Sequence, residues 1–271
     1  MEEPVGKSLS TVLSEKEVRR YALQINMSAI GKEGQEKIKQ TKVLVIGAGG
    51  KGSSVLQNLA TIGVGKLGIC DNYPVQENEL SRQYLYGNSD LGKQKAIISK
   101  QKLQVINHLI EYELHNVCLN ENNINLICYP YDILIDATDN FPARYLINDA
   151  AIHLKKPLIY GEVINGLGFT SVFNYRGGPS FRCLFPEPVK KENRAVCSGF
   201  SCQVATMSII GSIIANETIK IILSKDTILS GNLLQFDGGS YTFTFKKINR
   251  NPDNFKYLTI YPQSIQINRD N

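Results

Sequence analysis

Up to about residue 165, short apolar runs alternate along the chain with segments in which the hydrophobic residues have helical periodicity. Apolar runs rich in β-branched residues predict buried strands, and apolar positions three and four apart predict helices between them. The expected strands are 42–46, 66–70, 111–116, 132–136 and 157–160, and the expected helices are 52–62, 92–106, 121–128 and 141–154. Strands that alternate with helices predict a doubly wound, mostly parallel α/β sheet with right-handed crossovers.

The pattern changes after residue 165. Three later segments show the period-two alternation of antiparallel strands: 168–174, 232–236 and 241–247. The turn residues Asp237-Gly-Gly239 lie between the last two and predict a hairpin. A long apolar segment, 202–224, predicts a helix, and its polar residues favour a buried helix over a membrane span.

The N-terminal segment 12–40 is expected to be helical. Ser14 and Glu17 have the spacing of a capping box that begins a helix over 12–25, and a shorter helix is expected at 32–39. We therefore expect one domain over residues 1–271. Its parts are the helical segment 12–40, a nucleotide-binding half 41–165, and an antiparallel extension with a crossover loop, 166–271.

Glycines follow the first predicted strand directly. Gly47, Gly49 and Gly52 separate this strand from the next helix, and Asp71 ends the second strand. Glycines let the backbone approach a phosphate, the helix N-terminus offers free N–H groups, and a carboxylate can hold ribose hydroxyls. The sequence therefore predicts a Rossmann-like nucleotide site at the carboxyl edge of the sheet.

The residues after Asp71 indicate which nucleotide is used. Arg82 lies in a long connection over 72–90, Lys95 follows it, and Asp139 comes after the strand 132–136. Two cations suit the phosphates and a departing pyrophosphate, and a carboxylate suits a magnesium ion. Hydride transfer by a nicotinamide cofactor needs no such combination of two cations and a carboxylate. The pattern favours ATP and predicts Arg82, Lys95 and Asp139 as catalytic residues.

Composition limits the classes of binding partner and the cellular compartment that we expect for this protein. The net charge of +5 is spread along the chain without a basic, aromatic-rich stripe, so no nucleic-acid partner is expected. The acidic start Met1-Glu-Glu-Pro has no apolar core, so we expect no signal peptide. Six cysteines lack the dense spacing of a disulfide scaffold. A cytoplasmic protein without membrane association is the simplest expectation.

The motifs together resemble the ThiF/MoeB/HesA branch of the ubiquitin-activating-enzyme superfamily. The resemblance extends over residues 17–250 in an ordered set of motifs. The matching stretches are Arg20-Tyr21 with Gln24, Gly47-Ala-Gly-Gly-Lys-Gly52, Thr61-Ile-Gly-Val-Gly65, Leu80-Ser-Arg-Gln83, Gly92-Lys-Gln-Lys95, Asp136-Ala-Thr-Asp-Asn-Phe141 with Arg144, and Gly211-Ser212 with Glu217-Thr-Ile-Lys220.

This resemblance implies a nucleotidyltransferase: an adenylyltransferase that uses ATP and Mg²⁺ and forms a homodimer. Its substrate would be the C-terminal carboxylate of a ubiquitin-like sulfur-carrier protein ending in Gly-Gly, converted to an acyl adenylate as pyrophosphate leaves. By analogy Asp71 would bind the ribose and Asp139 the magnesium. The implied nucleotide-binding residues are Gly47, Gly49, Gly50, Gly52, Asp71, Asn78, Glu79, Ser81, Arg82, Lys95, Asp139 and Asn140.

The chain departs from the family pattern at several positions. Leu23 stands where relatives carry an arginine that reaches the partner subunit's ATP; Arg19 or Arg20 are candidate substitutes. Glu79 replaces an asparagine, and Tyr73 replaces a second acid. Zinc-binding relatives use two Cys-x-x-Cys pairs, of which Cys183 alone remains here. Tetrahedral zinc needs four ligands, so no zinc site is expected, and Cys183 is expected in the core.

Cys197 and the choice of substrate leave alternatives open. Cys197 aligns with a crossover-loop cysteine that reacts covalently in some relatives, and Lys191 and Arg194 could lower its pKa. A buried, unreactive role is the alternative. Other functions consistent with the sequence are activation of a ribosomal precursor peptide in natural-product maturation, a non-catalytic partner subunit, and a nicotinamide- or flavin-dependent oxidoreductase.

Overall fold

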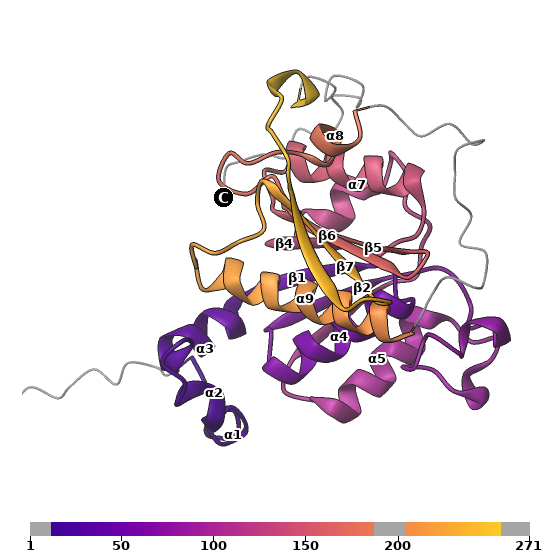
Figure 1. The fold of residues 1–271 in the computed structure, drawn as a ribbon. Helices are drawn as coiled ribbons and strands as arrows, with labels where there is room; N and C mark the ends of the chain where they lie inside the picture. Colours follow the sequence, from indigo (N-terminus) through magenta and orange to yellow (C-terminus); the bar gives the residue numbers. More distant parts are fainter. Residues whose placement is uncertain (1–11, 187–203, 256–271) are drawn as a thin grey trace, which may run out of the picture.

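The computed structural model of the chain describes residues 12–186 and 204–255 (Figure 1). Within these residues one sheet has the strand order β3-β2-β1-β4-β5-β6-β7-β8. The strands are β1 (Lys42–Ile46), β2 (Lys66–Cys70), β3 (Glu111–His115), β4 (Ile133–Asp136), β5 (Leu158–Ile164), β6 (Leu167–Phe173), β7 (Asn232–Asp237) and β8 (Thr242–Lys247). Strands β1 to β5 pair in parallel and β5 to β8 pair antiparallel, which confirms the expected Rossmann-like α/β fold with an antiparallel extension.

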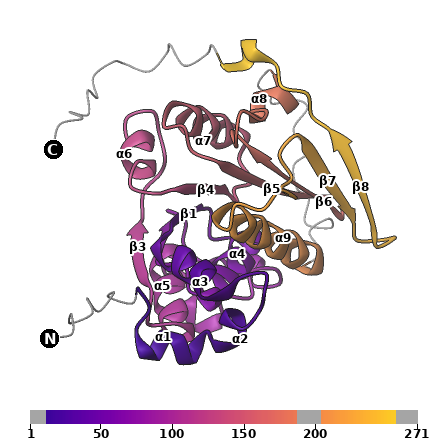
Figure 2. The same ribbon diagram turned by 90° about the vertical axis from the view of Figure 1, so that its left-hand side faces the viewer.

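Helices cover both faces of the sheet (Figure 2). They are α1 (Glu15–Arg20), α2 (Ala22–Ile25), α3 (Gly31–Gln40), α4 (Gly50–Ile62), α5 (Lys95–Ile106), α6 (Ile124–Cys128), α7 (Phe141–His153), α8 (Phe181–Leu184) and α9 (Val204–Ile222), with short 3₁₀ turns η1 (Glu77–Glu79) and η2 (Asn88–Asp90). Val43 and Val45 face α4, α5 and α9, whereas Leu44 and Ile46 face α6 and α7. Because strand side chains alternate in direction, each face of β1 has its own hydrophobic core.

The register brings the carboxyl ends of the central strands together. β1 lies between β2 and β4, with Ile46 opposite both Cys70 and Asp136. The residues that follow these strands therefore leave the same edge of the sheet. Ligands of doubly wound sheets bind at this edge, where the strand order reverses.

The N-terminal helices differ from the expected single helix over 12–25. The capping box of Ser14 and Glu17 is present, but the helix ends at Arg20 and a short helix begins at Ala22. Tyr21 between them is buried, and its hydroxyl accepts a hydrogen bond from Asn107 at 2.8 Å. The prediction of one continuous helix was wrong because this tertiary contact fixes Tyr21 outside helical geometry.

Other element boundaries also shift. The helix expected from residue 92 begins at Lys95, because Gly92 has a left-handed backbone (φ +75°) and cannot continue a helix. The helix α6 begins at Ile124 rather than 121, and β5 extends past 160 to Ile164. The hairpin expected around Asp237-Gly-Gly239 is confirmed by the β7–β8 pairing.

The long apolar helix α9 packs in the interior of the fold. It is the one helix among the described residues that is long and apolar enough to cross a bilayer, and half of its apolar window is buried. A Cβ added at Gly168 or Gly161 would lie 2.3 Å from side-chain atoms of Ile210 or Ile214. This close contact with β5 and β6 is the packing of a core helix.

Candidate nucleotide-binding site

The loop between β1 and α4 forms a cradle of backbone at the carboxyl edge. Gly47 has φ +96°, and a Cβ at Gly52 would lie 2.0 Å from the Gly47 carbonyl oxygen. Gly50 faces Met207 and the Arg82 carbonyl, at 2.3 and 2.9 Å from a Cβ placed there. At Gly49 the added Cβ would meet only Gln83, at 3.6 Å. The loop therefore requires glycine for its own path and stays open at Gly49, as a phosphate cradle does.

Asp71 connects this cradle to β2. Its Oδ2 accepts the Ala48 N–H and its Oδ1 accepts the Tyr73 N–H, both at 2.8 Å. Burial raises the pKa of Asp71, and the two backbone hydrogen bonds act in the opposite direction. Each carboxylate oxygen keeps a lone pair that can accept a ribose hydroxyl.

The segment after β2 brings Arg82 to the same edge. One guanidinium nitrogen, Nη1, donates to the Asn78 carbonyl at 2.9 Å. The rest of the guanidinium has no partner among the described residues, and its side chain is half-buried. Asn78 and Ser81 are exposed. Arg82 therefore keeps donors for an anionic ligand.

Lys95 and Glu79 form an ion pair. Lys95 Nζ lies 2.8 Å from both carboxylate oxygens of Glu79. Gln83 Nε2 also donates to this carboxylate, at 2.9 Å, and so does the Gln76 N–H, at 3.2 Å. The sequence predicted both residues near a nucleotide, but the pairing between them is a finding of the structure. Glu79 therefore occupies the ammonium of Lys95 in this structure.

The loop after β4 carries the predicted metal ligand. Asp136 Oδ1 accepts hydrogen bonds from the Thr138 N–H and hydroxyl, at 2.9 and 2.7 Å, which fixes the start of the loop. Asn140 Oδ1 caps α7 at the Ala143 N–H. Asp139 is exposed and makes no hydrogen bond or ion pair within the described part of the chain. A free carboxylate with oxygen donors nearby is the ligand chemistry that Mg²⁺ prefers.

A buried charge cluster lies beneath this loop. Arg144 is 1% exposed; its Nη1 lies 2.8 Å from Glu162 Oε1, and its Nη2 donates to the Thr138 carbonyl at 3.0 Å. The Nε of Arg144 lies 3.9 Å from Asp136. Burial raises the pKa of Glu162, but the charge and hydrogen bonds of Arg144 outweigh this and the net pKa is lowered. Arg144 thus fixes the loop that presents Asp139.

Lys51 is the site residue that the sequence reasoning missed. It stands inside the glycine motif, at the second position of α4, and is 6% exposed. Its Nζ donates to the Thr138 carbonyl at 3.3 Å. Burial and the charge of Arg144 lower the pKa of Lys51, and the opposing charges of Asp139, Glu162 and Asp136 only partly offset them. A lysine between Gly50 and Gly52 was the available signal, because a side chain there starts at the phosphate cradle.

The sequence comparison decides the family. The ThiF family matches residues 21–256, which is most of the chain. This chain belongs to the ThiF family. All the motif stretches quoted from the sequence, from Tyr21 onwards, fall inside the matched range.

Several proteins are similar to this member of the ThiF family. The sulfur carrier protein adenylyltransferase of Thermus thermophilus is 38% identical over 244 residues, which cover 88% of this chain and 90% of that protein. Adenylyltransferase and sulfurtransferase MOCS3 of Anopheles gambiae is 41% identical over 242 residues, or 89% of this chain and 55% of the relative. The chain thus spans about half the length of the MOCS3 proteins. A crystal structure of Escherichia coli MccB with ATP has a TM-score of 0.75 at 19% identity, covering 90% of this chain and 75% of that one, which shows a shared fold.

The cysteines of this ThiF-family chain have different environments. Cys197 lies outside the described residues. Burial raises the pKa of Cys70 and of Cys128 to about 12, which disfavours the nucleophilic thiolate at neutral pH. Cys183, expected in the core, packs against the edge of a hydrophobic core cluster but is only half-buried, and its Sγ accepts the N–H groups of Ser180 and Asn251 at 3.4 and 3.3 Å. These bonds overcome the effect of burial and lower the pKa of Cys183.

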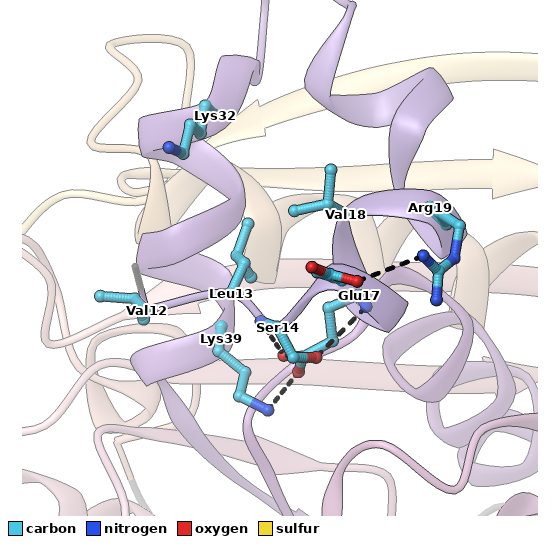
Figure 3. Close-up of a pocket in the computed structure, with 9 residues that line it drawn as sticks. Val12, Leu13, Ser14, Glu17, Val18, Arg19, Lys32 and Lys39 are labelled. Carbon is cyan, nitrogen blue, oxygen red and sulfur yellow. Dashed lines mark hydrogen bonds and ion pairs between the residues drawn. The ribbon is translucent and has the colours of Figure 1, made fainter. Parts of the chain in front are cut away.

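A surface hollow of about 620 Å³ lies between the N-terminal segment, α1 and α3 (Figure 3). It is lined by Val12, Leu13, Ser14, Glu15, Glu17, Val18, Arg19, Lys32 and Lys39. Arg19 lies 3.6 Å from Glu15, and Arg20 donates to the Ile106 carbonyl. Leu23, at the position of the family arginine, is 84% exposed. Both candidate substitutes for that arginine are therefore engaged within their own chain, away from its nucleotide site.

Proposed function

We propose that this chain adenylates the C-terminal carboxylate of a small ubiquitin-like sulfur-carrier protein, using ATP and releasing pyrophosphate. The observation that carries the proposal is the glycine cradle at the carboxyl edge, with Asp71 bound to it and the free carboxylate of Asp139 on the neighbouring loop. Identity of 38% to an adenylyltransferase of sulfur carriers, over 90% of that protein's length, supports the same reaction.

Different site residues would bind different parts of the ATP molecule. The N–H groups at the start of α4 would face a phosphate, and Asp71 would accept the ribose hydroxyls. Arg82 and Lys95 would bind the remaining phosphates and the departing pyrophosphate. The carrier carboxylate is already ionised at neutral pH, so the enzyme needs no general base; catalysis would come from positioning and charge stabilisation.

Magnesium would bind at Asp139, with Asn140 beside it as a second oxygen donor. When bound, the ion would neutralise phosphate charge and favour departure of pyrophosphate. The hydrogen bonds from Thr138 to Asp136, at 2.9 and 2.7 Å, support this role because they hold the loop that carries Asp139.

We further propose that the protein is a cytoplasmic homodimer. The N-terminal segment exposes apolar side chains at Val18 in α1, at Leu23 in α2 and at Met27 after α2. An apolar surface of this kind is costly in a monomer and typical of an association face. Light scattering at micromolar concentration should give the mass of two chains; a monodisperse monomer would contradict the dimer.

Exchange of labelled pyrophosphate into ATP tests the proposed reaction. We expect exchange that requires magnesium and a carrier ending in Gly-Gly, and that is lost when the last two glycines are removed. Asp139→Asn should abolish exchange, while the control Asp226→Asn, which changes an exposed acid elsewhere, should retain it. Exchange with a short precursor peptide only would establish the alternative substrate. Absence of ATP binding would favour the partner-subunit function, and NAD binding the oxidoreductase.

A further inference from the structure

Lys51 bridges two loops of the candidate site. Its backbone lies in the first turn of α4, directly after the glycine cradle. The side chain reaches the loop after β4, where Nζ donates to the Thr138 carbonyl at 3.3 Å. Thr138 precedes Asp139, the proposed magnesium ligand. The ammonium group therefore lies between the two loops that would enclose the phosphates.

The charges of Asp139, Glu162 and Asp136 act on this ammonium, but it forms an ion pair with none of these carboxylates. Within the described residues no carboxylate lies within ion-pair distance of Lys51, although the residue is 6% exposed. Arg144, which is 1% exposed, has Glu162 at 2.8 Å. A buried cation without a paired carboxylate lowers stability, and such groups are typical of functional sites. The remaining N–H groups of the ammonium can serve an anion that this chain does not supply.

Loop fixation does not explain Lys51. The Thr138 carbonyl already accepts a hydrogen bond from Arg144 Nη2 at 3.0 Å, shorter than the bond from Lys51. Asp136 binds the Thr138 N–H and hydroxyl as well. An apolar side chain at position 51 would leave these contacts in place and would avoid the cost of a buried charge.

We propose that Lys51 is an additional phosphate-binding cation, which contacts the phosphoryl group held at the N-terminus of α4. This inference rests on the proposed function and deepens it. In adenylation a carboxylate oxygen bonds to the α-phosphorus while the bond from phosphorus to pyrophosphate breaks, and two anions must approach one another. An ammonium between the loops offsets this repulsion and the charge on the phosphoryl oxygens, and the phosphate charge in turn favours the protonated form of Lys51.

Binding of adenosine, AMP and ATP to the wild type and to Lys51→Met separates a phosphate contact from a structural role. We expect Lys51→Met to bind AMP and ATP about tenfold or more weakly, and adenosine unchanged, because only the first two carry phosphate. Its melting temperature should equal or exceed that of the wild type, because a buried charge is removed. Lys16→Met, a change of an exposed lysine, should bind all three like the wild type.

Lys51→Gln keeps a donor for the Thr138 carbonyl and removes the charge. We expect the same loss of AMP and ATP affinity as in Lys51→Met. Unchanged AMP and ATP affinity in both variants would overturn the inference while leaving the proposed function intact. Equal weakening of adenosine would also overturn it, since Lys51 would then support the cradle alone. A wild type that binds no adenine nucleotide would refute the proposed function and this inference together.

Discussion

The two edges of the parallel sheet differ in how their polar groups are satisfied. At the amino edge, Asn107 donates to the Tyr21 hydroxyl at 2.8 Å and to the Ala60 carbonyl at 2.7 Å, and accepts the Leu109 N–H at 3.1 Å. At the carboxyl edge, Asp139 is exposed and makes no hydrogen bond or ion pair with any described residue. Asn107 at the amino edge is thus hydrogen-bonded within the fold, whereas Asp139 at the carboxyl edge is available to a ligand.

This difference follows from the fold. Helices α1 to α3 cover the amino edge, so polar groups there lose water and must find partners within the chain. Loops form the carboxyl edge, where incomplete pairing leaves donors and acceptors for substrates. Substitutions at the amino edge should therefore change stability, and substitutions at the carboxyl edge should change binding.

Arg144→Met should have the largest effect on stability, although Arg144 lies at the carboxyl edge, where substitutions are otherwise expected to change binding. Its guanidinium is buried and lies within ion-pair distance of Glu162 and Asp136 in the interior. Its removal leaves the buried carboxylate of Glu162 without its ion-pair partner and should lower the free energy of unfolding by about 3–5 kcal/mol. Urea denaturation measures this loss. A variant as stable as the wild type would mean that these carboxylates take up protons without cost.

Asn107→Ala should destabilise the amino edge without changing the chemistry. The substitution leaves the buried Tyr21 hydroxyl without this donor, at a cost of about 1–3 kcal/mol, whereas the Ala60 carbonyl still accepts the Gly63 N–H at 3.3 Å. Exchange activity of the folded fraction, measured well below the melting temperature, should match that of the wild type. A loss of ATP affinity in the folded variant would show that the two edges are coupled.

Glu17→Gln tests the same edge through pH. Burial raises the pKa of Glu17, but its bonds with Lys39 and Ser14 outweigh this and the net pKa lies below the ordinary value. The contribution of Glu17 is therefore present above about pH 4.3 and lost as the pH falls through the lowered pKa. We expect the variant to be less stable by about 1–2 kcal/mol at pH 7, with the gap closing in acid. A gap independent of pH would contradict this assignment.

Glu79→Gln should have the smallest effect, and in the opposite direction. Glu79 occupies Lys95 and places a negative charge beside the expected phosphates. Neutralising it frees Lys95, so the ATP dissociation constant should fall several-fold, about 1 kcal/mol. Calorimetry with ATP measures the change, and Glu77→Gln at an exposed neighbour is the matched control. Weaker binding would indicate that Glu79 contributes to the metal site or holds Lys95 in its binding position.

The sequence predicted correctly those elements that are determined by residues close together along the chain. The run from Lys42 to Gly52 has strand, turn and helix signals in order, and both strand and helix are present in the structure. The break at Tyr21 was missed because a residue 86 positions away causes it. The Lys95–Glu79 pair and the Lys51 contact with Thr138 join residues 16 and 87 positions apart, so neither leaves a periodic signal in the sequence.

The measurement that tests the proposed adenylation most directly is the mass of a Gly-Gly carrier protein after incubation with the wild-type enzyme, ATP and magnesium. We predict a carrier heavier by one adenylyl group, formed with the release of pyrophosphate. The Asp139→Asn enzyme should leave the carrier unchanged. An unmodified carrier in the presence of folded wild-type enzyme that binds ATP would contradict the proposed function.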